Sequence, residues 1–419
     1  MMTNKMINQG CVLPTILVAL LLNFVGSANA QAVPRALNGD TPVEAGELAK
    51  GLSPDLKSDQ VAAAMRLVGD WQLARSKDRF TQDWTDAALY RGYLAAAESL
   101  KNTEYDDALI RVGKQFHWKL GSRQTEADDQ AIGYIYLKLY RRLHDREMLA
   151  AVEAQFDELM KEPAVCTESC HDGPLPDRVG PDGREEPKPL WWWCDALFMA
   201  PPVWAELANV TGKREYLDYL DRNWWVTSKL LYDPKNRLFT RDATFLDKRE
   251  PNGEKVFWSR GNGWVLSGLT LVLDNMPRKY PTRRRYVEQF QAMASRIREI
   301  QGSDGLWRPG LLDADAYPLA EVSGSAFYVY AMAWGINHGL LERQIYLPAV
   351  RRGWAGLVGH IYADGRLGSI QPIGSSPGGY KPQSSYVFGV GAFLMAGAEI
   401  RTLLDRDQRP HHDQKGNKR

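Results

Sequence analysis

The sequence predicts an all-α fold, an (α/α)6 barrel in which six helical hairpins form an inner and an outer ring. Three observations predict it: regularly spaced polar segments that lead into apolar runs, one-sided amphipathic stretches between those runs, and few strand signals. With 419 residues, of which 44% are hydrophobic, the chain can bury one large core. A single domain over residues 31–405 is expected, after a leader over 1–30 and before a polar tail over 406–419.

Six inner helices are predicted from short polar or glycine-containing segments that each open a mostly apolar run. These segments contain, in chain order, Trp84, Asp128, Asp195, Asn262, Ser323 and Ser385. The steps between these residues are 44, 67, 67, 61 and 62 residues, and each step fits one helical hairpin with its loops. Pro201 and Pro202 cannot lie inside a regular helix, so the third inner helix either begins near Pro201 or kinks there.

Outer helices are predicted between the inner ones, because apolar residues there recur every three or four positions on one face. After Arg284 these residues are Tyr286, Phe290, Met293, Ile297 and Ile300. The stretch 214–231 repeats the pattern with Tyr216, Leu217, Leu220 and Trp224. Turn-forming residues at 236–239, 304–307 and 364–367 precede inner helices. These loops are expected to share one rim of the barrel, where a binding site would surround the central mouth.

Asp195 is the strongest candidate for a catalytic group. It follows three tryptophans in the segment LWWWCDALFMAPP, residues 190–202. Apolar rings disfavour the charged form of a carboxyl group and raise its pKa, so Asp195 is expected to donate a proton near neutral pH. The alternative is that Asp195 only caps the helix that starts there. Trp193 is expected to line the same site.

A second motif, Arg-Gly-Asn-Gly-Trp at 260–264, combines a forked cation, an amide and a stacking face. A guanidinium can pair with a carboxylate through two hydrogen bonds, and an indole ring can cover the apolar face of a sugar. We therefore expect an acidic sugar to be bound by Trp258, Arg260, Asn262 and Trp264. The alternatives are a simple Asn-Gly turn and a structural ion pair at Arg260.

The first 30 residues predict export to the periplasm or the medium. Lys5 precedes an apolar stretch over residues 16–25, and Ala28-Asn29-Ala30 has the small-x-small pattern that a signal peptidase cleaves, so the mature chain would begin at Gln31. The apolar run is shorter than the roughly 20 residues of a spanning helix, so no membrane partner is expected after cleavage. Cleavage removes one of 52 basic residues and none of 51 acidic ones, and the resulting neutral chain argues against nucleic acid as a partner.

No metal and no cofactor are predicted. Cys166, Cys170 and His171 lack a fourth ligand at a familiar spacing, and the other histidines are scattered. Whether Cys166 and Cys170 form a disulfide is open, whereas Cys194 is expected to be a buried packing residue.

Five segments together resemble glycoside hydrolase family 105, the unsaturated rhamnogalacturonyl hydrolases. They are LWWWCDALFMAPP (190–202), RDATF (241–245), KVFWSRGNGWV (255–265), DGLWRPGLLDADAYPLAEVSGSAF (304–327) and YVFGVGAFLMAGAE (386–399). The resemblance extends from about Trp84 to Glu399. It implies an (α/α)6 barrel that acts on the 4,5-unsaturated uronic acid at the non-reducing end of oligosaccharides that a lyase has cut from pectin.

The resemblance also implies the chemistry. In that family the aspartate that corresponds to Asp195 protonates C4 of the enol ether, water adds at C5, and the resulting hemiketal opens and releases the rest of the oligosaccharide. One acid that gives and then regains a proton suffices for hydration, whereas a conventional glycosidase needs two flanking carboxylates. Asp128 or Asp129 resembles the family's second acid. Which of them assists is open, and both could instead be helix caps.

Arg241 and Arg308 are further candidates for binding the acidic substrate. Some family members carry a histidine after the Leu-Phe-Tyr type segment, where this chain has Leu238-Phe239-Thr240-Arg241. Either arginine could instead form an ion pair within its loop. Glu321 lies at the predicted rim and is expected there either as part of the site or as the cap of the fifth inner helix.

Two other function classes are open at this stage. A polysaccharide lyase on a similar barrel would need a base, usually with a Tyr-His pair or an Arg-rich groove, and the scattered histidines do not assemble one. A non-catalytic protein that binds acidic sugars would keep the Trp and Arg residues but would not need a buried acid. The oligomeric state is not predicted.

Overall fold

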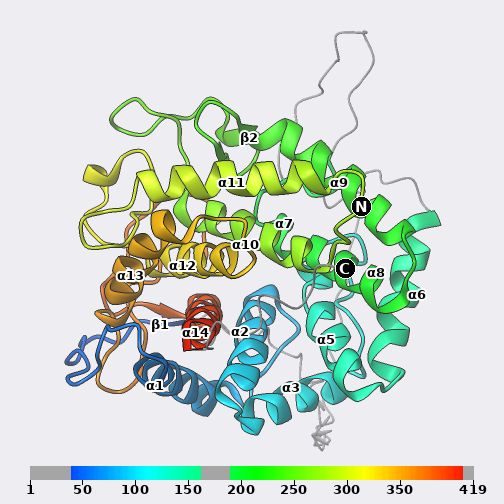
Figure 1. Ribbon diagram of the computed structural model, residues 1–419, viewed down its shortest axis with the longest axis horizontal. Coiled ribbons are helices and arrows are strands. Elements are labelled where there is room, and N and C mark those ends of the chain that lie inside the picture. Colours follow the sequence, from blue (N-terminus) through cyan, green and yellow to red (C-terminus); the bar gives the residue numbers. More distant parts are fainter. Residues whose placement is uncertain (1–38, 162–188, 409–419) are drawn as a thin grey trace, which may run out of the picture. The chain divides into compact units, whose positions relative to one another are not determined.

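The computed structural model describes residues 39–161 and 189–408, and over these ranges the helices form an inner and an outer ring (Figure 1). The outer helices are α1 (Ser58–Ser76), α3 (Thr103–Gln115), α6 (Glu147–Lys161), α9 (Glu215–Leu231), α11 (Arg283–Glu299) and α13 (Arg343–Val358). The inner helices are α2 (Trp84–Leu100), α4 (Ala127–Gln130) with α5 (Gly133–Leu143), α7 (Ala196–Met199) with α8 (Pro201–Thr211), α10 (Ser259–Asn275), α12 (Val322–Asn337) and α14 (Val387–Gln408). The predicted (α/α)6 barrel is confirmed.

The inner ring closes where α14 packs against α2, the first inner helix. Glycines let these two helices approach closely, since a Cβ atom on Gly92 would lie 2.5 Å from the carbonyl oxygen of Gly391. A Cβ atom on Gly391 would in turn collide with the carbonyl oxygen of Ala88. The ring therefore depends on small residues at its closing seam.

The two rings differ in how they are buried, as the sequence pattern predicts. In α11 the predicted face is buried at Tyr286, Phe290, Met293 and Ile297, and Ile300, just after the helix, is partly buried. Arg284 and Arg285 of this helix are exposed. The inner helices are buried around most of their circumference. One of them, over Val387–Arg406, is long and apolar enough to span a membrane by composition, but 78% of its most apolar window is buried inside the ring.

Two inner helices are interrupted close to the candidate acids. The third is broken between α7 and α8, and Pro201 and Pro202 occupy the first positions of α8, where no backbone N–H is lost. Helix α8 thus begins at Pro201, and the inner helix, counted from α7, is interrupted directly before it, so each of the two alternatives for Pro201 describes part of the structure. The second inner helix is likewise divided into α4, which carries Asp128 and Asp129, and α5.

The strands are very short. β1 (Gly39–Asp40) pairs with β4 (Ser385–Tyr386), and β2 (Tyr232–Asp233) pairs with β3 (Leu238–Phe239), both antiparallel. Two short 3₁₀ helices, η3 (Ala243–Phe245) and η4 (Ala314–Ala316), lie in the loops before α10 and α12.

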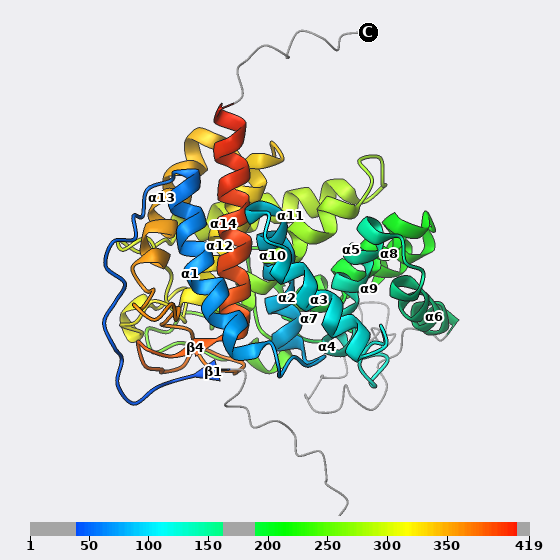
Figure 2. The same cartoon turned by 90° about the horizontal axis from the view of Figure 1, so that it is seen from below.

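Figure 2 shows β1, β4 and α4 toward the same side of the ring. This side is the rim at which outer helices lead into inner ones. Helix α14 runs to Gln408, three residues past the predicted end of the domain at 405. The predicted leader over 1–30 and the cysteines at 166 and 170 lie outside the described residues.

Candidate active site

Asp195 lies directly before α7 at the rim. Its backbone is helical (φ −63°, ψ −31°), and its carboxylate makes no capping hydrogen bond to the helix. The alternative that Asp195 serves only as a helix cap therefore has no support in the geometry. The side chain is 12% exposed, so the carboxyl group is largely enclosed but not sealed from solvent.

A backbone contact brings Arg241 beside Asp195. Trp193 and Asp242 form an isolated antiparallel bridge, and the backbone N–H of Cys194 donates to the carbonyl of Arg241 at 2.7 Å. The guanidinium of Arg241 then lies 3.5 Å from the Asp195 carboxylate through its Nε. Its Nη1 donates to Asp242 at 2.7 Å, which fixes the direction of the fork.

Two opposing effects act on the pKa of Asp195. Burial raises the pKa above its ordinary value, and the positive charges of Arg241 and Arg260 lower it, with burial the larger effect. Cys194 contributes less, through an S–H that lies 3.7 Å from the carboxylate. The balance favours a carboxyl group that can hold a proton at higher pH than an exposed aspartate and can also release it.

The carboxyl groups of Asp128 and Asp129 have different neighbours. Asp129 accepts hydrogen bonds from the backbone N–H of Arg123 at 2.8 Å and from its guanidinium at 2.6 Å, so its carboxylate is occupied within its own loop. For Asp128, burial and the nearby charges of Glu126 and Asp195 raise the pKa well above its ordinary value. Of the two neighbours, Asp128 is thus the one whose carboxyl group is influenced by the charge of Asp195.

The three tryptophans before Asp195 differ in their exposure to solvent. Trp191 is fully buried, and Trp193, the predicted ligand, is only 5% exposed. Trp192 is partly exposed and lies under the guanidinium of Arg241, whose central carbon is 5.4 Å from the ring centre. Trp192 rather than Trp193 therefore offers an aromatic surface beside the acid.

Arg260 differs from its predicted role. The residue has no exposed surface, and its two terminal nitrogens donate to the carbonyl groups of Gln371 and Pro372 at 2.7 and 2.6 Å. Its guanidinium also lies 4.4 Å from the ring centre of Trp258. With its fork occupied by backbone carbonyls, Arg260 holds the 371–372 loop in place instead of presenting a fork to a ligand. These contacts favour the structural alternative, with backbone carbonyls rather than a carboxylate as the main partners.

The other residues of this motif are also turned inward. Trp264 is 1% exposed and packs against Phe198 and Phe327 in the barrel interior, which leaves no free face for a sugar. The amide of Asn262 is fully buried and bonds both the N–H and the carbonyl of Phe239. Trp258 is 2% exposed and donates its indole N–H to Gln371.

Arg308 and Glu321 follow the structural alternatives as well. Arg308 forms an ion pair with Asp304 at 2.9 Å, within its own loop. Glu321 is fully buried and caps α12 by accepting from the backbone N–H groups of Ser323 and Gly324. It also accepts from the N–H of Gln371 at 3.1 Å and lies 3.8 Å from Arg260.

Sequence reasoning missed Gln371, to which three inner-ring residues are tied. Its backbone and side chain bond Glu321, Arg260 and Trp258, and its amide N–H also reaches the carbonyl of Ser376. No local pattern singles it out, because it lies in an irregular loop and Glu321, Arg260 and Trp258 are 50 or more residues away. In the described ranges, no group of three or more His, Cys, Asp or Glu side chains is arranged to hold a metal ion.

Comparison with known proteins agrees with this fold. Residues 58–404 match the model of Glycosyl Hydrolase Family 88. An unsaturated 3S-rhamnoglycuronyl hydrolase from Formosa agariphila is 42% identical over 360 residues, which cover 83% of this chain and 92% of that protein. A protein of the same name from an Alteromonas species is 31% identical, with 78% and 79% covered.

Solved structures give the same result. A glycosyl hydrolase family 88 structure from Bacteroides vulgatus is 28% identical with a TM-score of 0.73, covering 83% of this chain and 99% of its own. A structure that bears the name polysaccharide lyase is 27% identical with a TM-score of 0.75, covering 84% and 99%. The resemblance to unsaturated rhamnogalacturonyl hydrolases drawn from the motifs is confirmed. The family match and the relatives together identify this chain as a glycoside hydrolase that belongs to Glycosyl Hydrolase Family 88.

Proposed function

We propose that the enzyme removes a 4,5-unsaturated uronic acid from the non-reducing end of an oligosaccharide by hydrating its C4=C5 double bond. The observation that carries the proposal is the state of Asp195, an enclosed carboxyl group that caps no helix, has a raised pKa and lies 3.5 Å from Arg241. The pair supplies a proton donor beside a cation. An enol ether with an attached carboxylate needs both groups.

The reaction needs no second carboxylate on the anomeric side. Asp195 gives its proton to C4, and the positive charge that develops at C5 is shared with the ring oxygen. Water adds to C5 and returns a proton to Asp195, which leaves a hemiketal. Opening of the C5–O bond forms a ketone at C5 and a hemiacetal at C1, and breaking the C1–O bond then releases the shortened oligosaccharide as an alcohol.

Asp128 and Arg241 have supporting roles in this proposal. Burial raises the pKa of Asp128 well above its ordinary value, which favours its protonated form, and in that form the group can donate a hydrogen bond to water or to a sugar hydroxyl. Arg241 pairs with the carboxylate of the uronic acid. That pairing neutralises the charge that lowers the pKa of Asp195, so substrate binding itself favours the protonated acid.

For the substrate, we propose an unsaturated uronic acid joined to rhamnose. Two relatives at 42% and 31% identity bear names that describe an unsaturated rhamnoglycuronyl group. A fragment of rhamnogalacturonan from pectin is the second candidate, and the motif resemblance to rhamnogalacturonyl hydrolases favours it. A panel of both lyase products, followed by the ultraviolet absorbance of the conjugated double bond, distinguishes them. This absorbance falls in a hydration and rises in a lyase reaction.

We also propose that the enzyme acts outside the cytoplasm, because Lys5, the apolar stretch at 16–25 and Ala28-Asn29-Ala30 follow the sequence pattern of a signal peptide. N-terminal sequencing of chain recovered from the periplasm or the medium should begin at Gln31. Full-length chain that stays in the cytoplasm of its native host would contradict export.

Replacing Asp195 by Asn should keep the fold and lower kcat by about 10²–10⁴-fold, the usual effect of losing a general acid. Asp128→Asn should cost less, because an amide can still donate a hydrogen bond. Asp129→Asn is the matched control, since its carboxylate is held by Arg123, and it should lower stability rather than kcat. Asp195→Asn enzyme that keeps a tenth of normal kcat would remove Asp195 from the catalytic role.

Replacing Arg241 by Gln should raise KM by about 10- to 100-fold, because charge-assisted hydrogen bonds contribute about 1.5–3 kcal/mol. The same change should move the alkaline limb of the kcat/KM profile to higher pH, since Arg241 lowers the pKa of Asp195. Arg308→Gln is the control, because Arg308 is paired with Asp304. An Arg241→Gln profile with an unmoved limb would show that the two groups are not coupled.

A further inference from the structure

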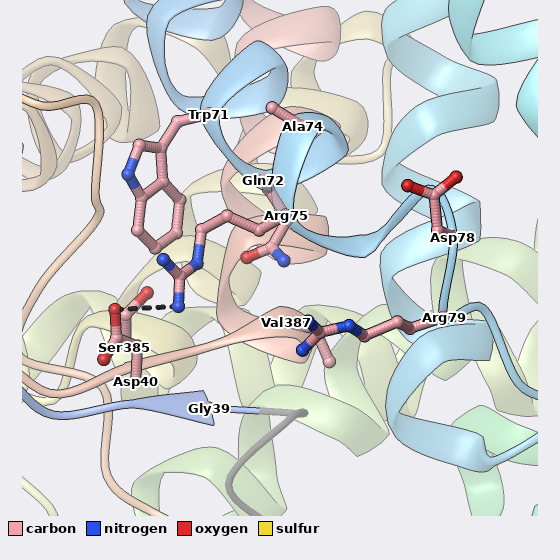
Figure 3. A pocket seen from close by; sticks show the side chains of 10 residues that line it. All are labelled: Gly39, Asp40, Trp71, Gln72, Ala74, Arg75, Asp78, Arg79, Ser385 and Val387. Carbon is pink, nitrogen blue, oxygen red and sulfur yellow. Dashed lines mark ion pairs between the residues drawn. The ribbon is translucent and has the colours of Figure 1, made fainter. Parts of the chain in front are cut away.

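Arg91, on the first inner helix α2, is a buried cation that pairs with no carboxylate in the part of the chain that the structure describes. An arginine at the end of α1 has the usual partner, since Arg75 pairs with Asp40 at 3.1 Å (Figure 3). Burial lowers the pKa of Arg91 to about 10, so its guanidinium is still charged at neutral pH. A buried charge without a counter-ion is unfavourable unless hydrogen bonds satisfy it, so the groups that Arg91 contacts are informative.

This guanidinium is bound at the break in the third inner helix. Its Nη1 donates to the carbonyl of Phe198 at 2.5 Å, and its Nη2 donates to the carbonyl of Met199 at 2.9 Å. In a continuous helix these carbonyls would accept from the backbone N–H groups four residues further on. Pro202 has no N–H, and the N–H of Val203 donates three residues back instead. Arg91 therefore replaces two backbone donors that the break removes.

The same guanidinium reaches the break in the second inner helix. Its Nη2 lies 3.5 Å from the carbonyl of Ala131, between α4 and α5, which is a longer and weaker contact than those in α7. Its central carbon lies 4.2 Å from the ring centre of Phe198 in α7 and 4.8 Å from that of Tyr134 in α5. Arg91 thus contacts both of the interrupted inner helices.

Each of these contacts lies one turn from a candidate acid. The carbonyl of Asp195 accepts from the N–H of Phe198 at 3.0 Å, and the carbonyl of Asp128 accepts from the N–H of Ala131 at 3.3 Å. In both turns, the residue that donates to the carbonyl of the acid offers its own carbonyl to Arg91. Within the described ranges, no hydrogen bond or ion pair joins Arg91 to either carboxyl group. Any effect of Arg91 on the acids therefore passes through the backbone.

We propose that Arg91 is a positioning residue of the active site, which holds the turns of Asp128 and Asp195 in a fixed relation to each other. The proposal rests on the proposed function, because it takes Asp195 as the proton donor. Misplacing a reacting group by about 1 Å can lower a rate roughly 100-fold, so loosening these two short turns should lower kcat. Arg241 is oriented by Asp242, outside both turns, so KM should change little.

The test compares wild type with Arg91→Met and Arg91→Lys at a temperature at which each protein is folded. Methionine fills the space but donates no hydrogen bond, and lysine keeps the charge but cannot bond both turns at once. Both changes should lower kcat by about 10- to 100-fold and leave KM within about twofold of wild type. If Arg91→Met does not fold, Arg91→Lys decides.

The pH profile gives a readout that a loss of stability alone would not move. A loosened α7 exposes Asp195 and weakens the burial that raises its pKa, so the alkaline limb of kcat/KM should move to lower pH. A direct charge effect would have the opposite sign, because removal of a nearby cation raises the pKa of a carboxyl group. A limb that stays in place or moves to higher pH in Arg91→Met would overturn the positioning role.

Arg283→Met is the matched control. Arg283 also donates to two backbone carbonyls of an inner helix, those of Leu273 and Met276 at 2.6 and 2.7 Å, but at the C-terminal end of α10 and away from the candidate acids. This variant should lose stability while it keeps kcat and the pH profile. An equal loss of kcat in Arg283→Met, or an unchanged kcat in Arg91→Lys, would contradict the proposal.

Hydrogen exchange separates the role of Arg91 from the proposed function, because it needs no turnover. The backbone amides of residues 128–132 and 194–199 should exchange faster in Arg91→Lys than in wild type, and at the wild-type rate in Arg283→Met. Equal exchange in wild type and Arg91→Lys would show that Arg91 does not hold the turns. If the wild-type enzyme lowers the absorbance of no unsaturated substrate, the proposed function fails, and exchange still decides whether Arg91 holds them.

Discussion

The contact on which the rest of the site depends is the backbone bridge between residues 193–194 and 241–242. This bridge holds Asp195, directly before α7, next to Arg241, which lies in the loop after β3. The bridge places a cation 3.5 Å from an enclosed carboxyl group, and Asp242 fixes the orientation of that cation. Burial raises the pKa of Asp195, and the positive charges of the two arginines lower it, so the two effects partly cancel. A group balanced in this way suits a reaction in which it gives and regains a proton.

The barrel supports this arrangement by breaking the regular helices near the acids. Asp128 lies in the short α4, and Asp195 directly precedes the short α7, whereas the inner helices without candidate acids run unbroken for 16 residues or more. At α7 the interruption follows from Pro201 and Pro202, which can begin a helix but cannot continue one. Gln371 lies in a neighbouring loop of the rim. Hydrogen bonds to Glu321, Arg260 and Trp258 attach this loop to the N-terminal ends of α10 and α12. The catalytic pair thus lies between loops that are themselves fixed to inner helices.

Sequence reasoning predicted the barrel, the amphipathic outer helices and Asp195, because each of these rests on a periodic or local signal. It placed Arg260, Asn262 and Trp264 in the binding site, since a cation, an amide and an indole within five residues also suit a sugar. The direction of these side chains is decided by α10, which is buried on nearly all sides, so its polar groups must find partners inside the protein. Local sequence patterns also could not decide which of Asp128 and Asp129 assists catalysis. Adjacent helical residues point about 100° apart, and the packing of α4 gives the two carboxylates different surroundings.

The central claim is that Asp195 delivers a proton to carbon, and turnover in heavy water tests it most directly. A carboxylic acid exchanges its proton with solvent between cycles, so product quenched early should carry solvent deuterium at C4. Product formed in ordinary water and then kept in heavy water for the same time corrects for exchange next to the new ketone. One deuterium at C4 beyond that correction is the result expected here. Normal cleavage with no deuterium at C4 beyond the correction would contradict hydration of the double bond and the role assigned to Asp195.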